Sequence, residues 1–216
     1  MSGAWPWVAV AALGAYHGID PSMGWLFAVA LGLQDQSAAR VMWALAPIAI
    51  GHLVSIGVVV AMFAALQSVI AIEWLRIVGA LALILFGIFR FARPRAHPRW
   101  VAMRVNFGDL GLWSFLMASA HGAGLMLFPI LIGMNPHAGA MHHMHHHMPA
   151  FGHPVSIIQA VAVVLVHTGA MVVVMGAIAI VVYEKVGLAI LRSAWINLDT
   201  IWAGALVAAG VLSLII

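Results

Sequence analysis

The chain has 216 residues, of which 65% are apolar and only 7% are charged. Soluble domains carry about 25% charged residues, so this composition excludes an ordinary soluble domain and predicts an integral membrane protein. The net charge of +3 indicates orientation in a bilayer rather than binding to nucleic acid. The absence of cysteine excludes disulfides, thiolate metal sites and iron–sulfur clusters.

A membrane-spanning helix needs about 20 mainly apolar residues. Several segments of the chain meet this requirement, and together they predict an all-α bundle of six transmembrane helices within a single membrane domain, 1–216. The predicted spans are approximately 5–33, 41–66, 72–91, 112–134, 155–183 and 195–216.

The first span contains the polar stretch GAYHGIDPSMG at 14–24. One helical turn separates His17 from Asp20, so a continuous helix would place both side chains on one face. Pro21 removes a backbone donor, which predicts an interrupted helix whose freed carbonyls line a cavity. Ionisable groups inside a membrane usually face the protein interior or water, so we interpret this stretch as half of a polar binding site.

The link after the third span, about 93–111, is rich in arginine and has Arg90 just before it. Lysine and arginine accumulate on the cytoplasmic side of membrane proteins, so we place this link in the cytoplasm. Lys185 and Arg192, between the fifth and sixth spans, then lie on the same side. Both termini are expected outside, and the expected location is the bacterial inner membrane.

The loop between the fourth and fifth spans, 135–154, has no lysine or arginine and is rich in histidine and methionine. Imidazole suits nickel, cobalt, zinc and copper, and thioether sulfur adds a preference for Cu(I). Such a tract is typical of metal collection by a tether, although a polar loop with incidental metal affinity has the same composition. The candidate ligands in this loop are His142, His143, His145, His146 and His147.

Three pairs of short sequences recur in the same order along the chain. AYHGID at 15–20 resembles SAHGAG at 119–124, GHLVSIGVVVAM at 51–62 resembles VHTGAMVVVMGA at 166–177, and VGALAL at 78–83 resembles AGALVA at 203–208. Repeat one would cover about 4–92 and repeat two about 112–216. Three helices in each repeat force the second copy into the opposite orientation, an architecture that transporters use with a site near the midplane.

Four histidines lie near the centres of the predicted spans, at matching places in the two repeats. With Asp20 they form our set of candidate metal ligands: His17, Asp20, His52, His121 and His167. A single buried histidine also serves as a hydrogen-bonding group between helices, and four of them in related positions favour a functional site. The expected protein is therefore a transporter and not an enzyme, with a transition-metal ion as its substrate.

Two other interpretations fit the same residues. Two histidines on different helices can hold a haem axially, which would make the protein an electron carrier. In the other interpretation, the protein is a helical subunit that delivers metal to a larger membrane complex. The chain has no Walker motif, so any dependence on ATP would need a partner chain. A homo-oligomer or a partner membrane subunit remains open, and the lipid bilayer is the expected surroundings.

The stretch GAYHGIDP followed by IGHLVSIGVVV resembles the NicO/UreH-type nickel and cobalt transporters of the LysE-like superfamily. The resemblance extends over most of the chain through the paired three-helix repeats. It implies metal-binding roles for His17, Asp20 and His52. The sequence reads Asp-Pro-Ser-Met where the family motif is expected to end Asp-Pro-Asp-His, and Met23 would shift the preference towards a softer ion.

Overall fold

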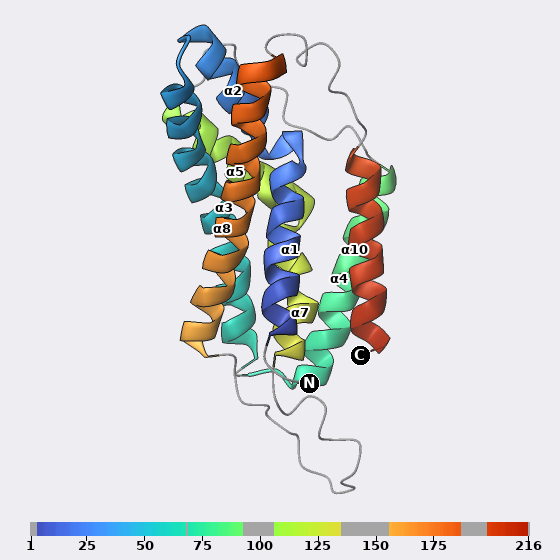
Figure 1. Ribbon diagram of the computed structural model, residues 1–216. Coiled ribbons are helices and arrows are strands. Elements are labelled where there is room, and N and C mark those ends of the chain that lie inside the picture. Colours follow the sequence, from blue (N-terminus) through green and yellow to red (C-terminus); the bar gives the residue numbers. More distant parts are fainter. Residues whose placement is uncertain (1–3, 68, 93–105, 135–155, 187–197, 216) are drawn as a thin grey trace, which may run out of the picture.

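A computed structural model of the protein describes residues 4–67, 69–92, 106–134, 156–186 and 198–215, and these residues are helical with short connections and contain no strand (Figure 1). The all-α prediction is confirmed for this part of the chain. The elements in chain order are α1 (Trp5–Ile19), the 3-10 turn η1 (Pro21–Met23), α2 (Trp25–Gln34), α3 (Ala38–Leu66), α4 (Ile72–Ala92), α5 (Phe107–His121), α6 (Ala123–Met126), α7 (Phe128–Gly133), α8 (Ile157–Val181), the π-helical turn η3 (Val182–Val186) and α10 (Leu198–Ile215).

Several of these helices are long and apolar enough to cross a membrane. In the described residues three helices meet this test: α3, α4 from Glu73 to Ala92, and α8 continued by η3. A fourth span is present if α5 and the following segment Ala123–Gly133, which are bent by 49° relative to each other, cross the membrane together. The predicted first span is divided into the shorter helices α1 and α2, and α10 has 18 residues. The helices therefore indicate a membrane protein.

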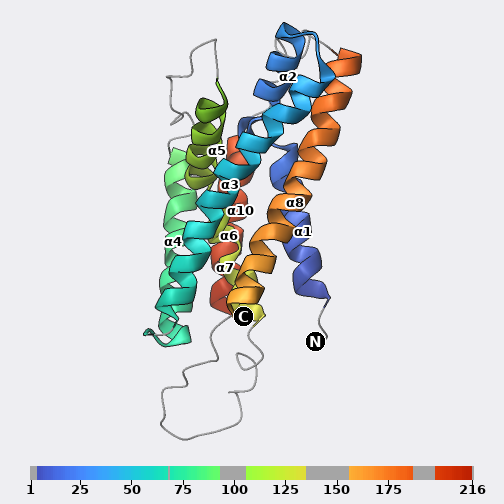
Figure 2. The same ribbon diagram turned by 90° about the vertical axis from the view of Figure 1, so that its left-hand side faces the viewer.

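The chain reverses direction between successive long segments of the bundle, in which α2 continues the course of α1, and α6 and α7 continue that of α5. The start of α1, the end of α3, the end of α7 and the end of α10 lie at the lower end in Figure 1, whereas α2 ends and α3 begins at the upper end. Figure 2 shows the same division from the side. The described ends that border 93–105 lie at the upper end, and those that border 135–155 lie at the lower end.

Two of the helical segments are broken just after a buried histidine. α1 ends at Ile19 because Asp20 is extended, with ψ 118°, and Pro21 cannot continue the helix. α5 ends at His121, where Gly122 takes a left-handed φ of 68° that favours glycine. The predicted interruption of the first segment is confirmed, and each break follows closely after a buried histidine.

Helix pairing brings the N-terminal and C-terminal halves of the chain together. α1 packs extensively along α8, α3 along α5, and α4 along α10. A Cβ atom on Gly14 would overlap the His167 carbonyl oxygen, and one on Gly51 would overlap the Gly111 carbonyl oxygen. Small residues at such crossings let helix backbones approach closely in membrane proteins, so α1 contacts α8 and α3 contacts α5 almost backbone to backbone.

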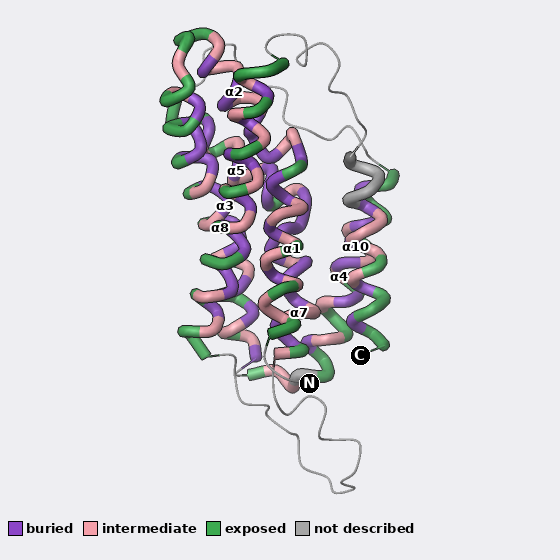
Figure 3. The backbone as a smooth tube through the Cα atoms, in the orientation of Figure 1, coloured by how far each residue is buried: buried purple, intermediate pink, exposed green. Residues whose placement is uncertain are grey.

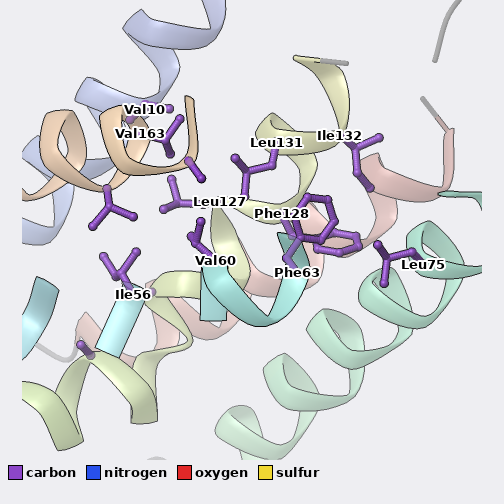
Figure 4. Packing of buried hydrophobic residues seen from close by; sticks show 14 residues of the cluster. Val10, Ile56, Val60, Phe63, Leu75, Leu127, Phe128, Leu131, Ile132 and Val163 are labelled. Carbon is purple, nitrogen blue, oxygen red and sulfur yellow. The ribbon is translucent and has the colours of Figure 1, made fainter. Parts of the chain in front are cut away.

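Of the three apolar clusters in the described residues, two lie on opposite sides of the buried histidines, and the third joins α4, α6 and α10. The cluster toward the lower end joins α1, α3, α7 and α8, with Phe63 and Phe128 edge to face at 5.0 Å (Figure 4). The cluster toward the upper end is formed by α2, α3 and α8 around Ile48 and Met171. The histidines therefore occupy a polar layer between two apolar layers.

The outer surface of the bundle is apolar. Many large apolar side chains point outward, among them Ile50, Val58 and Val173, which are 62%, 58% and 71% exposed. Figure 3 shows that buried and exposed positions alternate along the helices. A water-soluble protein rarely exposes so much apolar surface, whereas lipid is a suitable solvent for it. Charged and capping groups instead lie near helix ends, as in the Asp35–Arg40 ion pair at 3.0 Å.

Candidate functional site in the polar layer

Three imidazole rings from three helices meet in the interior of the bundle. His17 of α1, His52 of α3 and His167 of α8 are each 0% exposed. The ring centroids are 4.9 Å apart for His17 and His167, 5.4 Å for His17 and His52, and 5.5 Å for His52 and His167. We call these three residues the imidazole cluster. The sequence placed all three near mid-span, and the structure brings them together.

His52 and His167 share a hydrogen bond within this cluster. Their Nε2 atoms are 3.4 Å apart and their rings are within 4° of parallel. A neutral imidazole has one donor and one acceptor nitrogen, so one ring donates Nε2–H and the other accepts. Two nitrogen ligands of a tetrahedral ion with bonds of 2.0–2.1 Å are separated by about 3.4 Å. An ion could thus replace the shared hydrogen after the rings rotate so that their lone pairs converge.

His17 and His121 have the same orientation within their own helices. Nδ1 of His17 donates to the Leu13 carbonyl oxygen at 2.9 Å, and Nδ1 of His121 donates to the Met117 carbonyl oxygen at 2.8 Å. A carbonyl oxygen can only accept, so in the neutral form each ring keeps its lone pair on Nε2. Metal-binding histidines usually have this kind of support, which fixes the tautomer and the direction of the ring.

A second polar group lies where the break in the first segment meets α5. The backbone N–H and the hydroxyl of Ser22 both donate to Oδ1 of Asp20, each at 2.8 Å. Nε2 of His121 is 3.4 Å from the Ser22 hydroxyl and 3.8 Å from Oδ2 of Asp20. Asp20 is 3% exposed and His121 is 1% exposed. Oxygen and nitrogen atoms from two segments thus face one another in this group, as they do in sites that bind cations.

Asp20 does not lie on the helical face of His17, as a continuous helix would require. The helix ends one residue before Asp20, and the side chain caps the following turn instead. The five candidate residues of the spans therefore form two neighbouring groups. His17, His52 and His167 make one group, and Asp20 and His121 belong to the other together with Ser22.

The carbonyls freed by the helix break accept hydrogen bonds within the protein. The Trp25 indole donates to the Ile19 carbonyl oxygen at 3.2 Å, and the Trp113 indole donates to the Ser22 carbonyl oxygen at 3.1 Å. The carbonyls of Asp20 and Pro21 accept backbone N–H groups within the turn itself. Two tryptophans and the 3-10 turn thus satisfy these four carbonyls, and their lining of a cavity stays a prediction.

The arrangement is not a finished metal site. Within the described ranges, no three histidine, aspartate or glutamate side chains converge closely enough to hold a metal ion as they stand. The candidate ligands of the loop, His142, His143, His145, His146 and His147, lie outside the described residues. What the structure provides is a buried set of imidazoles whose rings are in contact and need side-chain rotation to surround an ion.

Sequence reasoning missed several polar residues of this layer. The Asp-Pro-Ser order is a signal for a side-chain turn, so the role of Ser22 could have been found. No local signal links Trp113 to Ser22, which is 91 residues away. The same holds for the Ser55–Ser119 hydrogen bond of 2.9 Å, which joins α3 and α5 beside the layer.

Protein-family models, curated proteins and solved structures were compared with the chain, and none of them matches. The candidate function therefore depends on the polar layer itself.

Proposed function

We propose that the protein is a transporter that moves a transition-metal ion across a membrane by way of the imidazole cluster. The observation that carries this proposal is the meeting of three fully buried imidazoles from three different helices, with ring centroids 4.9–5.5 Å apart. Ionisable groups are costly in a membrane interior and usually mark an ion path. Imidazole is a good ligand for nickel, cobalt, zinc and copper.

Two further features support a cation as the substrate. The carbonyl bond from Nδ1 directs the Nε2 lone pair of His17 away from its own helix backbone. The buried carboxylate of Asp20 lowers the electrostatic cost of bringing a positive ion into the apolar interior. An imidazole binds a metal only when it is neutral, so protons compete with the ion for the same nitrogens.

The helix pairing supports six spans arranged as two inverted repeats. In that architecture the first helix of repeat one corresponds to α5, the second to α8 and the third to α10. The α1–α8 and α3–α5 contacts are then equivalent, and α4–α10 pairs the two third helices. The carbonyl bonds of His17 and His121 are equivalent in the same scheme. The site would lie where the repeats meet, as in other transporters of this design.

Haem binding is the weaker alternative. A haem between His52 and His167 would need iron between two Nε2 atoms that are 3.4 Å apart and a porphyrin plane around it. The His17 ring lies about 5 Å from both of these rings, in the space that the porphyrin would occupy. A strong Soret band from protein purified without added cofactor would nevertheless favour haem over transport.

Metal flux into proteoliposomes tests the proposal. Substitution of His52→Ala removes one of the three imidazoles of the cluster, so we expect saturable flux to be lost even at high metal concentration. A matched control is Ser213→Ala, which removes a buried hydroxyl of α10 that donates to its own helix at Ala209. The control should keep at least half of the wild-type flux.

Deletion of 141–148 separates the loop from the polar layer. We expect this deletion to weaken flux at low metal concentration and to leave the maximal rate largely unchanged, because a tether only raises the local concentration of the ion. If the deletion abolishes flux at saturation while His52→Ala transports normally, the ion does not pass through the imidazole cluster.

A further inference from the structure

We infer that Trp113 is a positioning residue of the transport site, because its indole N–H fixes the Asp20–Ser22 turn against His121. The inference rests on the proposed function and adds to it the residue that controls the geometry of the second polar group. Trp113 lies on α5, outside both polar groups.

The first step of the argument is that the turn needs an external support. η1 has only three residues, and Gly24 after it takes a φ of 121°, so the segment has little regular structure of its own. Ser22 is half-buried, and a backbone carbonyl left unpaired at such a place in an apolar bundle is costly. The Trp113 indole satisfies this carbonyl at 3.1 Å.

The second step is that Ser22 is held from both sides by one helix. Its carbonyl accepts from Trp113, and its hydroxyl lies 3.4 Å from Nε2 of His121 on the same helix, α5. The same hydroxyl donates to Asp20 at 2.8 Å. A shift of the Ser22 backbone therefore moves the Asp20 carboxylate relative to His121.

The third step is that Trp113 is itself fixed. Its ring packs edge to face on Phe27 of α2, with centroids 5.2 Å apart. The indole thus joins α5 to both helical elements that follow the break in the first segment. Trp25, by contrast, donates to the Ile19 carbonyl within its own segment and adds no connection to α5.

Substitution of Trp113→Phe keeps an aromatic ring beside Phe27 and removes only the N–H donor. Loss of this partly buried hydrogen bond should raise amide hydrogen exchange of the turn by about tenfold. The reporting amides are those of Ser22, Met23 and Gly24, which are hydrogen-bonded within the turn. Trp43→Phe is the matched control, because that indole is 68% exposed on the outer face of α3.

The test combines this exchange measurement with metal flux on the full-length variants, using nickel, cobalt, zinc and copper in turn. We expect Trp113→Phe to raise exchange at the turn, to leave exchange around His52 unchanged, and to lower the maximal flux severalfold. The half-saturating concentration should stay within about twofold of wild type, because the imidazole cluster is intact. A merely structural role would instead loosen α3 and α8 together with the turn.

Two results would overturn the inference. One is that amide exchange at the turn is the same in Trp113→Phe as in Trp43→Phe. The other is that Trp113→Phe raises exchange over α3 and α8 as much as it raises exchange at the turn. Absence of saturable flux in the wild-type protein would contradict the proposed function instead. The exchange measurement uses no metal, so it would still decide whether Trp113 fixes the turn.

Discussion

At the scale of single residues, the chemistry of the layer depends on which nitrogen or oxygen of each side chain faces its neighbours. The carbonyl bonds of His17 and His121 reserve Nε2 in both rings. In Asp20, Oδ1 is occupied by Ser22 and Oδ2 faces His121. In neutral His17 and His121 the Nε2 atom is an acceptor, and an acceptor nitrogen is what a cation needs as a ligand.

Substitution of Asp20→Asn tests the electrostatic part of this view. The amide keeps an oxygen for Ser22 and removes the negative charge, so we expect at least about tenfold weaker binding of Co(II), followed by its visible absorption. Asp35→Asn is the control, because that carboxylate is half exposed and paired with Arg40. Equal affinity of Asp20→Asn and wild type would show that the carboxylate does not assist the cation.

The imidazole cluster itself predicts unequal effects among the buried histidines. His167→Gln should abolish stoichiometric Co(II) binding, because His167 contacts both other rings of the cluster. His121→Gln should weaken binding by a smaller factor, since His121 belongs to the neighbouring group. Isothermal titration of both variants in detergent gives the comparison. The opposite order would place the main site at His121.

At the scale of elements, the close approach of helix pairs holds the layer together. Gly14→Ala should destabilise the protein by about 1–3 kcal/mol, because the added methyl group meets the His167 carbonyl and forces α1 away from α8. Gly169→Ala on α8 is the control, since a Cβ there has nothing within 4 Å among the described atoms. Thermal unfolding in detergent measures both. Equal midpoints would mean that α1 and α8 are less tightly packed than described.

The sequence could predict the helices and one break, because apolar length and Pro21 are local signals. It could also predict that the four central histidines are buried, since they lie mid-span. It could not predict their division into two groups, which depends on where α1 ends and on how α5 meets η1. Nor could it predict that Trp25 and Trp113 satisfy the carbonyls of the break, because the second contact joins distant parts of the chain.

At the scale of the whole molecule, the described helix ends that border the two long links lie at opposite ends of the bundle. We expect the link that contains His97 to be cytoplasmic and the link that contains Ala140 to be outside, because arginine is concentrated in the first. The chain has no cysteine, so His97→Cys and Ala140→Cys can each be labelled alone. An impermeant reagent should reach only the second in intact cells, and labelling of only the first would reverse the orientation.

The polar layer lies between two apolar clusters, which cover the imidazole cluster toward both ends of the bundle. A transporter must open such a site to each side in turn. The broken segments at Asp20 and Gly122 are the places where the helices can change direction without losing hydrogen bonds along their whole length. Transport would therefore use the same two breaks that position the polar groups.

X-ray absorption of the metal-loaded protein tests the central claim most directly. The sample is the variant that lacks 141–148, so that the histidines of this tract cannot contribute ligands. We predict one tightly bound ion per chain with imidazole scatterers at about 2.0–2.1 Å, and loss of this signal in the same variant carrying His52→Ala. A sample without stoichiometric metal, or a spectrum that His52→Ala leaves unchanged, would contradict a metal site in the imidazole cluster.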